Sequence, residues 1–338
     1  MAERTARAAK KVSAPGPTAV VPTVAASSRL WSSLDHASLR RLIAEQIPRF
    51  RARPYLADVA LLRAFFATHL DTVLDDDYCW SLSFDPEFVR ALCFEGFLPI
   101  CAELGGGTGL FVLLPKLHAN RCILRFEDLH VPKKVRRRAL REAYTLHCDD
   151  AAFDAVLAGC IRQHGEDSWL HPPLRSALAT LRSTSAVSHD QSTGDASDVR
   201  PCCFALRRGD ELIAGEVGVL CGRVYTSFSG FFTVDGAGAV QMTLTARLLQ
   251  RARMAWWDMG QEHAYKRAHG ASSVPRQRFL DAFRDERELC NGLEEMMSLR
   301  QGGRRFSAAE LLAAAPGGML SAPAAACVVA RPAVEDVC

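Results

Sequence analysis

The feature that most constrains the fold is a change of hydrophobic period near residue 200. From Leu34 to Leu74 apolar residues recur every three or four positions, which is typical of helices, and further helices separated by short strands are expected up to Leu181. After residue 200, short apolar segments separated by Gly-containing turns follow one another, as in an antiparallel meander. These segments are Cys202–Arg207, Leu212–Leu220 and Arg223–Phe232. A helix over Ala237–Ala255 and a short strand over Met254–Met259 are expected next. The pattern predicts an α+β protein, helical and mixed at its N-terminal end, with an antiparallel sheet after it.

Composition divides the chain into four parts. Residues 1–33 are basic, poor in acids and interrupted by prolines, which predicts a disordered tail or, alternatively, an organelle transit peptide. Residues 34–145 form a mostly helical domain, with strands expected at Leu110–Leu114 and Cys122–Phe126. Residues 146–284 form a second domain, which carries a polar surface insertion at 183–199. Residues 285–338 read as a loosely ordered extension with short helices at 289–299 and 308–314.

The overall composition excludes several classes of protein. Hydrophobic residues make up 49% and charged residues 23% of 338, and no apolar run approaches the length of a membrane span. The net charge is only +3, so a nucleic-acid site must come from local clustering of basic residues. Twelve cysteines with no secretory leader predict reduced thiols. We therefore expect a cytoplasmic monomer without membrane contact, or a mitochondrial protein if residues 1–33 are a transit peptide.

One segment carries a dense cluster of basic residues. Six of the nine residues from 133 to 141 are basic: Lys133, Lys134, Arg136, Arg137, Arg138 and Arg141. These charges repel one another on an exposed helix unless an anion is near, and phosphate is the natural partner. The alternative is a solvated surface helix without a ligand.

Other motifs are weaker or missing. The glycines at 215, 218 and 222 lack the following helix and the acidic residue of a dinucleotide fold, and they indicate bulges or a close backbone approach. No zinc spacing and no Gly-x-Ser-x-Gly sequence occur, so we expect neither a metal nor a cofactor. Asp258 ends an apolar strand, where it is either an exposed residue or a positioned electrostatic group. Trp169 is either a core residue or part of a site.

Read in order, six segments resemble the bacterial leucyl/phenylalanyl-tRNA–protein transferases over roughly residues 80–283. The segments are Phe84–Pro99, His130–Arg137, Asp150–Val156, Ser168–Leu170, Gly215–Phe231 and Asp258–Leu280. The resemblance implies transfer of Leu or Phe from charged tRNA to a protein that begins with Arg or Lys, which tags that protein for degradation. It also implies a C-terminal domain of the acyltransferase (GNAT) type, shared with N-acetyltransferases but used without acetyl-CoA.

The resemblance also implies roles for individual residues. The basic segment at 133–141 would hold the tRNA acceptor stem, and Trp169 would help to form the site around the 3′ end. Phe231 would line the pocket for the amino acid side chain, while Asp258 would lie beside the reacting ester. The family has a glutamine two residues after that aspartate, and here Gln261 would substitute for it. The family's glutamate in Gly-Glu-Ser-Met-Phe-Ser falls on Phe228.

The chemistry requires no covalent intermediate. The donor is an activated ester and the acceptor is an α-amine with a pKa of about 7.7–8.0, so close alignment supplies much of the rate. A basic first residue on the acceptor needs an acidic partner. The candidates, in order of preference, are Asp258, Glu216, Asp235 and Glu262.

Two other functions remain open from the sequence. One is an inactive descendant of the family that binds tRNA or basic amino termini. The other is an acetyl-CoA-dependent acetyltransferase, which is disfavoured because no Arg/Gln-x-x-Gly-x-Gly/Ala loop precedes Ala237.

Overall fold

The computed structural model describes residues 34–68, 78–185, 199–300 and 303–313. The tail at 1–33, most of the insertion at 183–199 and the end of the C-terminal extension lie outside the described residues. The helices are α2 (His36–Gln46), α3 (Pro48–Arg51), α4 (Val59–Thr68), α5 (Pro86–Phe94), α6 (Lys133–Arg141), α7 (Phe153–His164), α8 (Pro172–Ser185), α9 (Ala237–Arg251), α10 (Ala264–Ala268), α11 (Arg276–Arg287), α12 (Asn291–Arg300) and α13 (Ala308–Ala313). The strands are β1 (Leu98–Glu103), β2 (Phe111–Lys116), β3 (Asn120–Arg125), β4 (Thr145–His147), β5 (Val199–Arg208), β6 (Glu211–Cys221), β7 (Val224–Phe232), β8 (Trp256–Asp258), β9 (Ser272–Pro275) and β10 (Arg305–Ser307).

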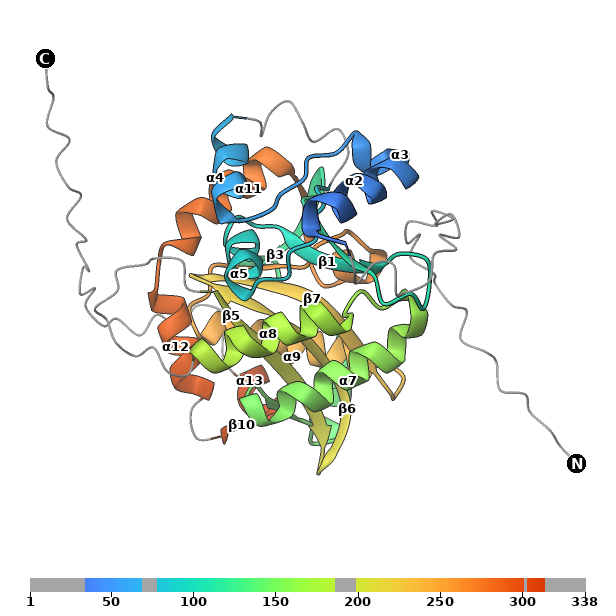
Figure 1. Ribbon diagram of the computed structural model, residues 1–338. Helices are drawn as coiled ribbons and strands as arrows, with labels where there is room; N and C mark the ends of the chain where they lie inside the picture. Colours follow the sequence, from blue (N-terminus) through green and yellow to red (C-terminus); the bar gives the residue numbers. More distant parts are fainter. Residues whose placement is uncertain (1–33, 69–77, 186–198, 301–302, 314–338) are drawn as a thin grey trace, which may run out of the picture.

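An eight-stranded sheet organises the molecule (Figure 1). Its strand order is β10-β4-β5-β6-β7-β8-β3-β9, and β1 and β2 form a separate two-stranded sheet. The α+β class and the meander of β5, β6 and β7 confirm the sequence prediction. The pair β7–β8 is parallel, and α9 makes the connection between these two strands.

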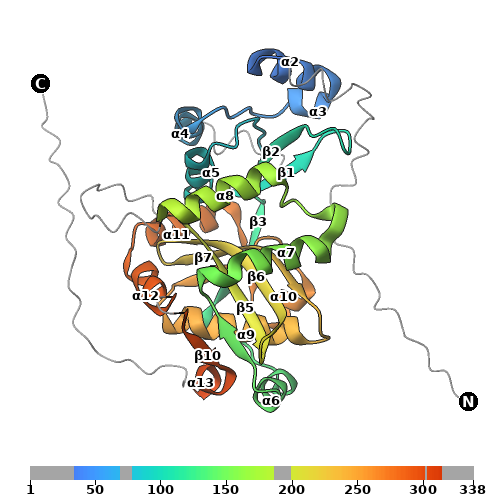
Figure 2. The ribbon, with the colours of Figure 1, turned by 60° about the horizontal axis from the view of Figure 1, so that its bottom comes forward.

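Helices cover both faces of this sheet (Figure 2). Helices α7 and α8 pack on one face, in an apolar layer that includes Val156, Leu178 and Val217. Helix α9 packs on the other face, in a second apolar layer that includes Leu244 and Leu248. The long strands β5, β6 and β7 therefore contribute side chains to an apolar layer on each face of the sheet. A third cluster of buried residues, which includes Phe50, Trp80 and Val112, lies among the N-terminal elements.

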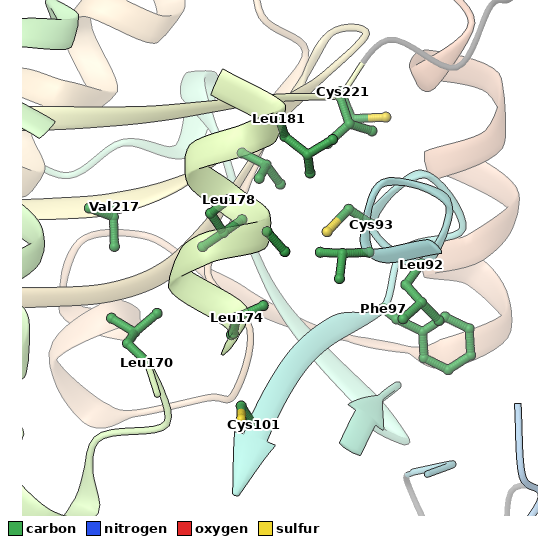
Figure 3. Close-up of a cluster of buried hydrophobic side chains, with 14 of the residues drawn as sticks. Leu92, Cys93, Phe97, Cys101, Leu170, Leu174, Leu178, Leu181, Val217 and Cys221 are labelled. Atoms are coloured by element: carbon green, nitrogen blue, oxygen red, sulfur yellow. The ribbon is translucent and has the colours of Figure 1, made fainter. Parts of the chain in front are cut away.

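The first apolar layer joins the N-terminal elements to the large sheet. Leu174, Leu178 and Leu181 of α8 lie between Cys93 of α5 and the sheet (Figure 3). Helix α5 begins as its sequence predicts, because the Asp85 carboxylate accepts a hydrogen bond from the Phe88 amide at 3.1 Å. The N-terminal segment is thus anchored by burial of aliphatic side chains.

The large sheet extends beyond the expected boundaries of the second domain. Strand β3 and helix α6 precede residue 146, yet β3 pairs with β8 and α6 packs against α9. In the C-terminal extension, α12 and α13 occupy the positions of the two expected short helices. Between them, β10 pairs with β4 at the edge of the sheet. In the part of the chain that the structure describes, no helix is long and apolar enough to span a membrane.

Candidate functional site

The parallel strands β7 and β8 part in the middle of the sheet. Their pairing runs from Val224 and Trp256 to Thr226 and Asp258, where β8 ends, whereas β7 continues to Phe232. The register of β6 against β7 shifts at the same level, so that Phe228 is an extra residue in β7. A bulge of this kind bends the strand and redirects its side chains. The end of β8, the bulge and the first turn of α9 together define the candidate site.

Asp258 lies at this parting and is completely buried in an ion pair with Arg121 of β3. Arg121 donates from Nε to Oδ1 at 2.9 Å and from Nη2 to Oδ2 at 2.8 Å, which is a bidentate contact. The Gly260 amide also donates to Oδ1 at 2.9 Å, and the Thr226 hydroxyl donates to Oδ2 at 3.1 Å. Each carboxylate oxygen of Asp258 therefore already accepts at least two hydrogen bonds.

Arg121 is fixed as firmly as its partner. Its Nη2 also donates to the Gly96 carbonyl at 2.9 Å, and its guanidinium lies 4.7 Å from the centre of the Phe279 ring. Its side chain is 1% exposed, and Nη1 is buried without a hydrogen-bond partner in the described part of the chain. No local pattern in the sequence points to Arg121, because its partner lies 137 positions away.

The aromatic residues of the candidate site lie on the face of the sheet covered by α7 and α8. Trp169 is half-buried and meets the Phe228 ring edge to face, with 5.5 Å between the ring centres. Phe231 is 5% exposed and packs against Gly159 of α7, where an added Cβ would lie 2.5 Å from the ring. Phe231 is thus a closely packed core residue, whereas Trp169 and Phe228 form the partly open aromatic pair.

Glu216 points to the opposite face, toward α9. Along β6, Gly215 faces Val156 of α7, so its neighbour Glu216 projects to the other side. Glu216 is 6% exposed, and its Oε2 accepts a hydrogen bond from the Ser227 hydroxyl at 3.4 Å. Its Oε1 is buried, and the Tyr225 and Gln241 side chains lie close enough to the carboxyl group to hydrogen-bond it and favour its charged form. Burial raises the pKa of Glu216 to about 8.

A buried lysine holds the loop that follows β8. Lys266 of α10 donates from Nζ to the Met259 carbonyl and, at 2.7 Å, to the Gln261 carbonyl. Burial lowers the pKa of Lys266. The Gln261 side chain itself is exposed, one residue beyond Gly260, whose positive φ of 70° favours glycine. The loop is therefore fixed through its backbone, and the Gln261 side chain extends into solvent.

The basic helix α6 is exposed and packs against α9. Five of its basic residues are exposed, namely Lys133, Lys134, Arg136, Arg137 and Arg141, and Arg138 is half-buried. Arg138 reaches the N-terminus of α9, because an added Cβ on Gly236 would lie 2.5 Å from its Nη1. Burial lowers the pKa of Arg247 of α9, and the nearby positive charge of Arg136 lowers it further.

The structure thus brings some of the predicted site residues together and separates others. Asp258 and Glu216 are both at the parting but on opposite faces of the sheet. Glu262, another candidate acid, forms an ion pair with Arg267 at 3.2 Å. No cluster of three His, Cys, Asp or Glu side chains suited to a metal ion occurs within the described ranges.

Comparison with known proteins gives a consistent result. Residues 123–284 match the model of the family described as leucyl/phenylalanyl-tRNA protein transferase. The leucyl/phenylalanyl-tRNA–protein transferase of Maridesulfovibrio salexigens is 27% identical over 190 residues, which cover 53% of this chain and 73% of that protein. The protein of the same name from Nitrobacter winogradskyi is 27% identical over 197 residues, 57% of this chain and 79% of that one. The protein of that name from Edwardsiella ictaluri is 27% identical over 160 residues, which cover 47% of this chain and 60% of that protein.

One solved structure resembles this fold only distantly. It is the C-terminal domain of a candidate lysylphosphatidylglycerol synthetase from Agrobacterium fabrum, with a TM-score of 0.36 and 12% sequence identity. The match covers 75% of this chain and 83% of that one.

Proposed function

We propose that this chain is an aminoacyl-tRNA–protein transferase, because residues 123–284 match the family model and the relatives named above are leucyl/phenylalanyl-tRNA–protein transferases, in agreement with the resemblance seen in its sequence. It moves Leu or Phe from charged tRNA to the amino terminus of a protein that begins with Arg or Lys. The amine attacks the ester directly, so the protein needs to align two bound substrates rather than form a covalent intermediate. We place the reaction in the cytoplasm.

The observation that carries this proposal is the packing of the basic helix against the helix that connects the two parting strands. Helix α6 packs on α9, and Arg138 of α6 lies beside Gly236, immediately before the first turn of α9. Helix α9 in turn connects β7 to β8. An acceptor stem bound along α6 would therefore bring its 3′ end toward the parting. The parallel pair with its connecting helix also supports an acyltransferase-type (GNAT) sheet.

The site residues take different parts in this proposal. Trp169 and Phe228, as a partly open aromatic pair, suit stacking against the 3′-terminal base or the transferred side chain. Phe231 packs in the core on the same face of the sheet as this pair and supports it from behind. Asp258 acts as a positioning residue, because its oxygens already bind Arg121 and Gly260 and so fix the end of β8. Gln261, on the loop that Asp258 and Lys266 hold, offers an exposed amide to the substrates.

A direct transfer assay tests the proposal. The full chain is incubated with tRNA charged with radiolabelled Leu or Phe and with a peptide that begins with Arg. We expect label in the peptide, and none when the peptide begins with Glu. Failure to transfer from any charged tRNA by folded protein at micromolar concentration would contradict the proposal.

The basic helix is tested separately by tRNA binding. Replacing Lys133, Lys134 and Arg137 together with Ala is expected to weaken tRNA binding and to reduce its salt dependence, because phosphate contacts release counterions. The matched control replaces the exposed Arg41, Arg51 and Arg63 of the N-terminal helices with Ala, and is expected to bind as the parent does.

A second function is favoured by two observations, namely the complete engagement of Asp258 and the aromatic Phe228 at a position where the family has an acid. In that case the protein binds tRNA without transferring an amino acid. Salt-dependent tRNA binding without label in the peptide would select this alternative.

A further inference from the structure

A cavity at the edge of the large sheet lies apart from the parting of β7 and β8. It has a volume of about 270 Å³, and strands β4, β5 and β10 contribute side chains to its walls. The 3-10 helix η2 (Asp150–Ala152), which precedes α7, closes one side. The polar residues that line the cavity are His147, Asp149, Arg207, Asp210 and Arg305.

The strand register places the basic residues of this cavity side by side. Arg305 of β10 pairs with His147 of β4, and Thr145, two residues before His147, pairs with Arg207 of β5. Residues that are directly opposite, or two apart along one strand, share a face of the sheet. His147 also pairs with Ala205, which belongs to the apolar layer under α7. The cavity therefore lies on the α7 face, at the edge where β4 and β10 extend past that helix.

The two arginines of the cavity have no acidic partner. Arg207 donates from Nη1 to the backbone carbonyl of Asp210 at 2.7 Å and forms no ion pair with the described residues. Arg305 forms neither a hydrogen bond nor an ion pair with any residue that the structure describes. Their neighbours in sequence differ, because Arg208 and Arg304 are each paired with a glutamate, at 2.8 and 3.0 Å. On these two strands, the arginines that face away from the cavity are compensated and those that line it are not.

The acids of the cavity do not cancel this positive charge. Asp149 accepts a hydrogen bond from the Ala152 amide at 3.0 Å, and its other oxygen lies 3.9 Å from Nδ1 of His147. Asp210 is exposed in the turn between β5 and β6. Burial lowers the pKa of His147, the two arginines lower it further, and Asp149 opposes them. The imidazole is therefore neutral near pH 7, and two uncompensated guanidinium groups lie beside it.

The cavity and the basic helix α6 lie on either side of the same β5–β6 hairpin. Strand β4 begins four residues after α6 ends. The pKa of Glu142, at the end of α6, is lowered by its hydrogen bond from Arg141 and, less strongly, by the charge of Arg208 in the hairpin. Helix α13, which follows β10, packs against α6 at this end of the molecule (Figure 2). A nucleic-acid backbone that leaves the end of α6 therefore reaches the cavity by passing the tip of the hairpin.

We propose that this cavity binds a phosphate group and that the backbone of the bound tRNA supplies it, an inference that rests on the transferase function proposed above. Guanidinium groups match the oxygens of a phosphate in geometry and charge, and Arg207 and Arg305 offer two of them to one ligand. Arg305 lies in the C-terminal extension, beyond the residues 123–284 that match the family. The extension thus completes a second phosphate contact next to the basic helix.

The test compares the double variant Arg207→Gln, Arg305→Gln with the parent in tRNA binding at several salt concentrations. We expect the affinity to fall about tenfold and the slope of log K against log salt to fall by about 1, because one phosphate contact is lost. The thermal midpoint should be retained, because Arg305 is exposed and Arg207 is half-buried. The matched control Arg208→Gln, Arg304→Gln removes the same charge from the same two strands and should change the affinity less than about twofold.

A calorimetric titration with inorganic phosphate identifies the source of the group. We expect the parent to bind phosphate and the cavity variant not to bind it. If phosphate binding is lost in the variant but tRNA affinity is unchanged, the tRNA contact is refuted and the site is one for free phosphate.

Two results overturn the inference as a whole. One is an equal loss of tRNA affinity in the cavity variant and the control, which would show that only net charge matters. The other is unchanged tRNA affinity together with no phosphate binding by the parent. If the parent binds no tRNA and transfers no label, the proposed function fails, and the phosphate titration still decides whether the cavity is an anion site.

Discussion

The buried ion pair of Arg121 and Asp258 gives the sharpest prediction about stability. Both side chains are at most 1% exposed, and the bidentate contact has N–O distances of 2.8 and 2.9 Å. Asp258→Asn keeps the shape of the side chain but leaves the guanidinium buried without a counter-charge. Breaking a pair of this kind from one side costs about 3–5 kcal/mol. At roughly 2–4 °C per kcal/mol for a domain of this size, the thermal midpoint falls by about 10 °C.

A double-mutant cycle measures the coupling directly. Arg121→Met alone leaves the Asp258 carboxylate uncompensated and is expected to cost a similar amount, about 3–5 kcal/mol. In the double variant neither charge of the pair remains, the asparagine amide oxygen can accept from the Gly260 amide in place of Oδ1, and the amide nitrogen can donate to the Thr226 hydroxyl. We therefore expect the double variant to be less destabilised than the sum of the single variants by at least about 2 kcal/mol.

The assay is urea unfolding of the full chain at pH 7, followed by tryptophan fluorescence. Asp154→Asn is the matched control, because its ion pair with Arg182 leaves the Asp154 side chain 80% exposed. Such a surface pair contributes less than about 1 kcal/mol. The reasoning fails if Asp258→Asn loses less than 1 kcal/mol, or if the two single effects simply add. Transfer activity of Asp258→Asn has to be measured well below its unfolding midpoint.

Three further predictions concern buried groups. Burial raises the pKa of Glu216 from 4.5 to about 8, so the stability that its protonated form contributes is fully present below about pH 4.5 and is lost as the pH rises through 8. In urea unfolding, Glu216→Gln should therefore be more stable than the parent at pH 8.5 and equally stable at pH 4.5. Gly159→Ala places a Cβ 2.5 Å from the Phe231 ring and should lower the free energy of unfolding by about 1–3 kcal/mol, despite the higher helix propensity of Ala. Iodoacetamide at pH 8 should modify the exposed Cys290 within minutes. It should not modify buried thiols such as Cys93, because burial raises the pKa of that thiol to about 12. Peptide mass mapping shows which cysteines are modified.

The parts of the fold that local pattern determines were predictable from the sequence. The meander of β5, β6 and β7 follows from alternating apolar segments and glycine turns, and α5 begins at its Asp85 cap. Strands β4, β8 and β10 have only three residues each, which is too short for a periodic pattern. Their positions depend on pairing with distant strands. For that reason the sequence does not predict β4 and β10. It does predict the end of β8, because an acid, Asp258, follows the apolar residues there.

The candidate site was only partly predictable for a related reason. The sequence identified Asp258 as an isolated acid, but its partner Arg121 is 137 residues away, and no local signal connects the two. Glu216 was expected to be a substrate contact, and an acid within a strand gives no sign of burial. Its environment is set by β7 and α9 together, because the bulge at Phe228 brings Ser227 within reach of its carboxyl group.

The two buried acids differ in how their charge is balanced, and this difference determines which of them responds to pH near neutrality. The charge of Asp258 is already balanced by Arg121, so an ammonium ion gains little by approaching it. Glu216 has no such partner, and burial keeps it largely protonated in the free protein at neutral pH.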